Sequence, residues 1–248
     1  FNMPLWYDGL ITSDYIKIFI SGCLGMGFAD ILFIYALSQI GANRVAIINC
    51  FEPAVIYFFS IIILGTILTT QQLVGFIIVI FSLLIITYEN DGIEINQKIK
   101  KRGMVLQIIA VLLSSFGIVL IKPVLTKTNN VIELQLWITA FRLFPGFIIA
   151  WLVFLFQKNK FALLLPIKKS KVLKKILLSS GLGTFIALSF WIIGYANIDK
   201  PPVASIIGQT SVIFITIFAW IILKEKISKL RIFSMIIALS GVFLITIK

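Results

Sequence analysis

Histidine is absent from this 248-residue chain, which also contains only two cysteines. Because histidine is the commonest metal ligand and general base near neutral pH, its absence argues against a metal-dependent or hydrolytic enzyme. Cys23 and Cys50 both lie in apolar runs and provide no disulfide framework. The phosphate-binding pattern G-x-x-x-x-G-K-[ST] is also missing, so ATP is not expected to drive the protein. The sequence therefore predicts a protein that is not an enzyme and that needs neither a cofactor nor a metal ion.

Charged residues are also scarce, at 13% of the chain, whereas 60% of the residues are hydrophobic. The mean hydropathy of +1.07 lies far above the range of ordinary soluble domains. The apolar residues form runs of about 18–25, and a helix needs roughly 20 residues to cross the hydrocarbon layer. Since lipid cannot satisfy exposed backbone polar groups, only helices suit these runs. The composition predicts an all-α integral membrane protein.

The net charge of +12 comes from Lys and Arg residues that cluster between the apolar runs. This placement is typical of loops at an anionic membrane surface, and no run combines the cations with exposed aromatics. We therefore expect the lipid bilayer as a partner and no nucleic acid. Sixteen of the 22 cations fall in alternate loops on one side, which the positive-inside rule places in the cytoplasm, with the C-terminus outside.

Eight apolar runs have the length and composition of transmembrane helices. They cover residues 16–39, 43–66, 72–88, 103–121, 132–156, 174–197, 202–223 and 230–247.

An internal repeat relates three of these helices to three others. SGCLGMGFADILFIYAL (21–37) is similar to SGLGTFIALSFWIIGYA (180–196), with an offset of 158 residues. The next pair, 45–65 and 204–224, matches at an offset of 159, and so does the following pair. Any two Ile-rich helices have some similarity, but three consecutive helices in register favour a true repeat.

The repeat predicts two five-helix halves, of which the first lacks its first two helices in this sequence. Residues 1–89 would hold the last three helices of the first repeat, 90–102 a charged loop, and 103–248 the complete second repeat. The protein would then have ten transmembrane helices, eight of them present here, and this sequence would be a fragment. Five helices per half is an odd number, so the halves would be inverted relative to each other.

These residues resemble the EamA-type branch of the drug/metabolite transporter superfamily. The glycine-rich helix ends in Tyr-Ala-Leu (Gly25 to Leu37), the next contains Glu52-Pro53, and the last contains Gly241-Val242 after Glu225-Lys226-Ile227-Ser228. Arg142 in AFRLFPG is similar to the Arg-Phe pattern of the second helix in each half of such proteins.

The resemblance implies a secondary transporter that moves a small polar metabolite, such as an amino acid or a related compound, usually outward. A multidrug efflux transporter and a non-transporting helical scaffold are the alternatives. The expected partners are a small-molecule substrate and the bilayer, with a homodimer as an open alternative. The use of many Ile, Asn and Lys residues suggests a low-GC bacterium, so the expected location is the bacterial inner (cytoplasmic) membrane.

Three ionisable residues inside the apolar runs are the candidates for substrate binding or proton coupling: Glu52, Asp30 and Arg142. Charged groups are costly in lipid, so these side chains should face the protein interior or a water-filled cavity. Pro53 beside Glu52 removes a backbone hydrogen bond and predicts a helix kink. A structural role, in which each group pairs with a neighbouring helix, is the alternative in all three cases.

Four further residues are expected to line a central cavity. Asn49 and Gln209 occupy similar depths in the two halves, at the level where inverted-repeat transporters bind their substrates. Tyr35 and Trp191 would supply aromatic walls, although such aromatics more often serve packing or the membrane interface.

Overall fold

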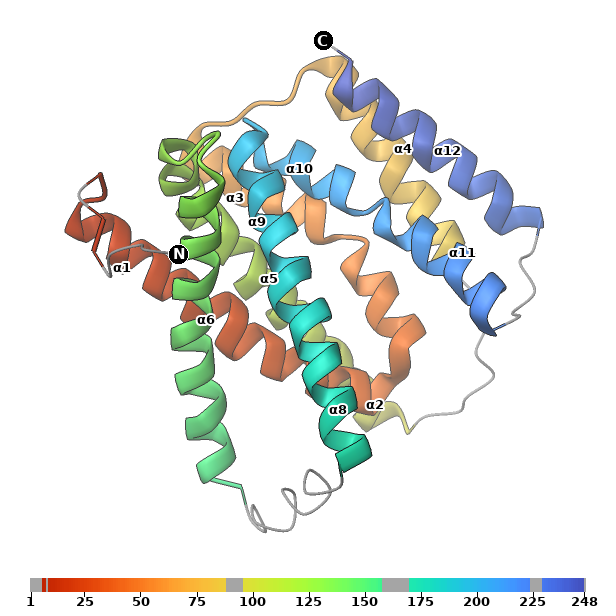
Figure 1. Cartoon of the computed structure of the whole chain (residues 1–248). Helices are drawn as coiled ribbons and strands as arrows, with labels where there is room; N and C mark the ends of the chain where they lie inside the picture. The colour runs from red at the N-terminus through yellow and green to blue at the C-terminus, as the bar shows by residue number, and fades with distance from the viewer. Residues whose placement is uncertain (1–5, 8, 88–95, 158–169, 224–228, 248) are drawn as a thin grey trace. The chain divides into compact units, whose positions relative to one another are not determined.

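The computed structural model describes residues 6–7, 9–87, 96–157, 170–223 and 229–247, and the regular elements in these ranges are helices (Figure 1). The described chain divides into two compact units that both draw on distant parts of the sequence. The first unit contains Phe1–Ile31 and Phe116–Asp199, and the second contains Leu32–Ser115 and Lys200–Lys248. Each predicted half of the sequence therefore contributes to both units.

The first unit is built from both α-helical and π-helical segments. Its elements are α1 (Thr12–Ser21), η1 (Gly22–Ala29), α6 (Ile132–Leu155), α8 (Ser170–Ser179), η3 (Ser180–Ile186), α9 (Ala187–Asn197) and the last part of α5 (Gln97–Lys127).

The second unit holds the remaining helices. They are most of α2 (Asp30–Asn49), α3 (Glu52–Leu64), α4 (Thr70–Thr87), the first part of α5, α10 (Pro201–Gly208), α11 (Ser211–Leu223) and α12 (Lys229–Thr246).

Helices occupy the positions that the apolar runs predict. Five helical segments of the described chain are long and apolar enough to cross a membrane: Thr12–Ala42, Arg44–Leu64, Gln97–Lys127, Ile132–Leu155 and Ser170–Asn197. Three shorter apolar helices cover Thr70–Ile85, Pro201–Phe214 and Ile232–Thr246. The nearly all-helical structure agrees with a membrane protein, whereas the number of crossings stays a prediction.

The helix predicted over residues 43–66 is interrupted. The chain first breaks at Gly41, where φ is +78°, and the helical pattern stops again at Cys50 and Phe51. Pro53 lies in the first turn of α3, where its missing N–H removes no intrahelical bond. α3 ends at Leu64 because Gly65 adopts the left-handed conformation.

The bounds of the elements recur at the offsets of the sequence repeat. η1 and η3 begin 158 residues apart, and the interruption at Cys50–Phe51 recurs 159 residues later at Gln209–Thr210. α3 and α11 both have 13 residues, and α4 and α12 both have 18. Similar sequences at these offsets thus form similar local structures.

α4 and α12 lie side by side and run antiparallel (Figure 1). Gln71 donates a hydrogen bond to the Leu244 carbonyl at 2.9 Å, and a Cβ on Gly75 would lie 2.7 Å from the Gly241 oxygen. Small residues at the crossing let the two backbones approach closely. Antiparallel packing of two equivalent helices is the arrangement that an inverted repeat requires.

Candidate functional site

One buried face of α6 carries a row of polar side chains. Gln135, Thr139 and Arg142 are spaced four and three residues apart, so they share one helix face, and each is at most 1% exposed. Gln135 donates a hydrogen bond to the Thr128 carbonyl at 2.8 Å, and the Thr139 hydroxyl donates one to the Gln135 carbonyl at 2.9 Å. The first two members of the row therefore have partners.

Arg142 lacks such partners. It is among the largest fully buried side chains of the described chain, and neither its Nε nor its Nη1 has a hydrogen-bond partner there. Arg142 lies ten residues after Ile132, or about 15 Å along α6. Each buried unsatisfied polar group costs roughly 1–3 kcal/mol. A ligand that accepts these hydrogen bonds would offset that cost.

Glycines in η1 allow that segment to pack tightly beside Arg142. A Cβ on Gly22 would collide with the Arg142 carbonyl oxygen and would lie 2.6 Å from Pro145 Cγ. A Cβ on Gly25 would lie 3.3 Å from Arg142 Nη2. α6 also contributes a glycine to this contact, because a Cβ on Gly146 would lie 2.7 Å from Met26 Cβ in η1. At Gly25, therefore, bare backbone lies beside the guanidinium.

Trp191 and Asp30 complete the surroundings of Arg142. The Trp191 ring centre lies 5.9 Å from Arg142 Cζ, within the range of a cation–π interaction, and 4.5 Å from the Tyr195 ring centre. Asp30 follows η1 directly and is exposed. The charges of Asp30 and Arg142 interact, but no direct ion pair joins them among the described residues. The structure thus brings together three of the residues that the sequence singled out.

Two polar contacts hold α9, the helix that carries Trp191. Lys122 is only 4% exposed, and its Nζ donates hydrogen bonds to the Tyr195 carbonyl at 2.7 Å and the Ile198 carbonyl at 2.6 Å. Asn197 donates a longer bond, 3.4 Å, to the Gln135 side chain. The lysine thereby neutralises the carbonyl end of α9.

The second unit has a polar group of its own at the interruption between α2 and α3. The Gln107 side chain, 1% exposed, donates a hydrogen bond to Asn49 Oδ1 at 2.6 Å, and its own Oε1 has no partner among the described residues. Glu52 begins α3 two residues after the helical pattern stops and is half-buried. No hydrogen bond or ion pair joins its carboxylate to another described residue.

Gln209 and Tyr35 also belong to the second unit. Gln209 lies at the interruption between α10 and α11, and it is half-buried. Tyr35 lies in α2 and is 43% exposed. The roles of both residues as cavity walls stay predictions.

Sequence reasoning missed four residues that the structure places at these polar sites: Gln135, Thr139, Lys122 and Gln107. The spacing of Gln135, Thr139 and Arg142 on one helix face was a signal that could have been found. The contacts of Lys122 and Gln107 involve residues 58 or more positions away, so no local pattern indicates them.

The arrangement around Arg142 is suited to binding and not to bond-making chemistry. It offers a cation, an acid and an aromatic face. The described residues contain no group of three His, Cys, Asp or Glu side chains that could hold a metal ion. The apolar helices, the buried cation and the irregular π-helical backbone define a multi-pass membrane protein with a polar site inside its helices.

A model of the EamA-like transporter family matches the chain over residues 2–88 and 101–247. The chain therefore belongs to the EamA-like transporter family, which is part of the drug/metabolite transporter superfamily. Membership indicates a membrane transporter, and proteins of this family are in general not enzymes. No curated protein matches the chain.

Solved structures share the fold. Among 25 matching chains, one described as "Crystal structure of protein" superposes with a TM-score of 0.66. The alignment covers 96% of this chain and 79% of that one, at 12% sequence identity. At this identity the likeness establishes the fold alone.

Proposed function

We propose that this protein is a secondary transporter that moves a small polar metabolite, an amino acid or a related compound, across the bacterial cytoplasmic membrane. Transport proceeds by alternating access between two inverted halves and runs outward. The recurring element bounds and the antiparallel packing of α4 with α12 support the inverted halves. The two-repeat organisation and the orientation expected from the loop charges belong to the same proposal.

The buried guanidinium of Arg142 carries the proposal, because its Nε and Nη1 have no hydrogen-bond partner among the described residues. Nε and Nη1 together bear three N–H donors, and a carboxylate is the group that accepts such donors in a planar arrangement. Because Gly25 has no side chain, it does not cover the neighbouring Nη2 of Arg142. A substrate carboxylate would therefore bind at Arg142, deep within α6.

Asp30 would recognise the ammonium group of the same substrate. It is exposed, it carries the opposite charge, and it lies near Arg142 without pairing with it. A carboxylate at this depth needs water or a polar ligand beside it. Trp191 would pack against the apolar part of the substrate, as aromatic residues do in small-molecule sites.

Glu52 is the candidate for proton coupling. It has no hydrogen-bonding partner among the described residues and lies at an interrupted helix, where the backbone can rearrange. A carboxyl group in such a place can take up a proton on one side of the membrane and release it on the other. Asn49, Gln209 and Tyr35 would line the path of the substrate.

The two alternatives fit less well. A scaffold would have its intramembrane charges in direct ion pairs, whereas no ion pair joins Arg142 or Glu52 to another residue in the described part of the chain. A multidrug efflux site would be broad, aromatic and weakly charged, whereas here the Arg142 guanidinium is fully buried and the exposed Asp30 near it adds the opposite charge.

Flux measurements in proteoliposomes test the proposal. A pH gradient should drive zwitterionic amino acids, but neither nucleosides nor a hydrophobic cationic dye. Glu52→Gln should abolish the dependence on the gradient and leave counterflow exchange intact, whereas Glu133→Gln, which changes an exposed acid near the start of α6, should alter neither. Dye transport without amino-acid transport would favour multidrug efflux, and the absence of flux for every solute would favour a scaffold.

A further inference from the structure

Three cations project from the first turns of α5. Lys98, Lys101 and Arg102 are spaced three and one residues apart, and all are exposed. Val105 and Leu106 follow one turn later, and the five residues line a pocket of about 340 Å³. Known small-molecule sites range from about 300 to 1,000 Å³. This part of α5 is therefore cationic where the helix starts and apolar one turn further on.

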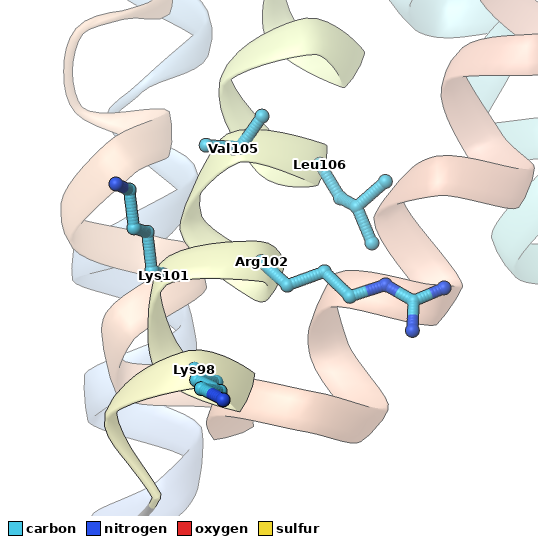
Figure 2. A pocket seen from close by; sticks show the side chains of 5 residues that line it. All are labelled: Lys98, Lys101, Arg102, Val105 and Leu106. Atoms are coloured by element: carbon cyan, nitrogen blue, oxygen red, sulfur yellow. The ribbon is translucent and has the colours of Figure 1, made fainter.

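Figure 2 shows how these side chains are arranged. Arg102 and Leu106 extend toward the same side of the α5 ribbon, Lys101 extends toward the opposite side, and Lys98 lies one turn below Arg102.

A close contact between α5 and α2 supports the pocket. A Cβ on Gly103 would collide with the Ile40 side chain and would lie 3.3 Å from Gln39 Cβ. The turn between Arg102 and Leu106 is thus pressed against α2, within the same unit. Gly103 is buried in this contact, and the partly buried Leu106 packs beside it against Ala36, Ile40 and Val45 of α2.

An exposed apolar stripe continues from the pocket along α5. Val105, Ile108, Ile109 and Leu112 are each between 39% and 46% exposed. These residues recur every three or four positions, so they form one continuous helix face. From Lys98 to Leu112 the helix rises by about 21 Å, which is comparable to one leaflet with its headgroup region.

We propose that the pocket at the start of α5 binds an acidic phospholipid. Lys98, Lys101 and Arg102 contact the phosphate, and Val105 and Leu106 contact the first part of an acyl chain. The rest of the chain lies along the exposed apolar stripe. This site is separate from the substrate site, and it does not depend on the direction or the substrate of transport.

Charge complementarity favours this occupant. No hydrogen bond or ion pair ties the three cationic side chains to another described residue. Clustered cations at a membrane surface attract acidic lipids, with each contributing to the affinity. A free phosphate would use only the cationic end of the pocket and would leave Val105 and Leu106 in contact with water.

α8 provides a matched control. Lys171, Lys174 and Lys175 have the same spacing as the three cations of α5, and they are exposed in the same way. However, α8 has no buried residue, so its cations have no packed helix behind them. If surface charge alone attracted acidic lipid, the two clusters would behave alike.

Thermal unfolding of the purified chain in detergent, with added lipid, tests the proposal. Phosphatidylglycerol should raise the unfolding temperature, and phosphatidylcholine or soluble glycerol phosphate should not. The triple change Lys98→Gln, Lys101→Gln and Arg102→Gln should weaken the apparent affinity for phosphatidylglycerol roughly tenfold or more. The same change at Lys171, Lys174 and Lys175 should leave that affinity unchanged.

Other results would overturn the proposal. These are an equal loss in both triple variants, stabilisation by glycerol phosphate alone, or no difference between the two lipids. The single exposed change Lys101→Glu provides a second test if the triple variant unfolds. Lys101→Glu should reduce the rise in unfolding temperature caused by phosphatidylglycerol more than Lys101→Gln does. An equal reduction in the two variants would contradict the proposed lipid site.

Discussion

The two π-helical segments have similar sequences and different surroundings. Both η1 and η3 follow a serine and contain a Leu-Gly pair. The glycines of η1 are pressed against α6, whereas no atom lies within 4 Å of a Cβ added to Gly181 or Gly183 of η3. η1 contains four buried residues and η3 contains none.

The π-helical backbone and its functional surroundings therefore have different origins. Because η3 forms the π-helical turn without packing, the local sequence is sufficient to produce it. Only in η1 does the irregular backbone lie beside a buried charge, Arg142. π-Helical turns are rare and are frequently found at functional sites, so we assign the function to η1 and its partner α6.

The largest expected effect comes from filling the contact between η1 and α6. Gly22→Leu places a side chain against the Arg142 carbonyl and Pro145, which should lower the free energy of unfolding by about 1–3 kcal/mol or prevent folding. Gly181→Leu in η3 meets open space and should leave stability unchanged. Thermal unfolding in detergent measures both. Equal effects of the two changes would contradict the difference between the segments.

A second prediction concerns α9, which continues from the unpacked η3. If η3 contributes little to the packing of α9, Lys122 should hold this helix in place through its hydrogen bonds to the Tyr195 and Ile198 carbonyls. Hydrogen bonds from a charged donor contribute roughly 1.5–3 kcal/mol, so Lys122→Met should destabilise the protein by about 2 kcal/mol. Lys175→Met, at an exposed position of α8, should have no such effect. A stable Lys122→Met variant would show that other contacts hold α9.

The smallest expected effect is at Trp191. A cation–π contact at a partly exposed site contributes about 0.5–1 kcal/mol, so Trp191→Leu should raise KM for the substrate roughly two- to fivefold with little change in stability. Trp151→Leu alters a tryptophan on the outer face of α6 and should leave KM unchanged. A rise in KM for both variants would indicate a general effect of losing an indole ring.

Much of the fold could be predicted from the sequence, because hydropathy and repetition are local signals. The positions of the helices and the equivalence of residues 21–37 with 180–196 are of this kind. The interruption at Cys50–Phe51 was predicted only as a kink at Pro53, since proline indicates where hydrogen bonds fail but not which residue leaves the helix.

The ionisable residues of the candidate site could be predicted from the sequence, whereas the residues that surround them could not. Asp30 and Arg142 stand out because charges are rare in apolar runs. Their proximity depends on the packing of η1 against α6, whose residues are more than 100 positions apart in the sequence. The composition of the two compact units from both halves of the chain is likewise set by long-range packing.

The central claim is that Arg142 binds a carboxylate of the substrate, and substrate selectivity in proteoliposomes tests it most directly. The wild-type protein should prefer an amino acid over the amine that lacks only the carboxyl group, and Arg142→Gln should remove this preference while amine transport persists. Arg102→Gln, at the exposed start of α5, should keep the preference. An unchanged preference in the Arg142→Gln variant would contradict the claim.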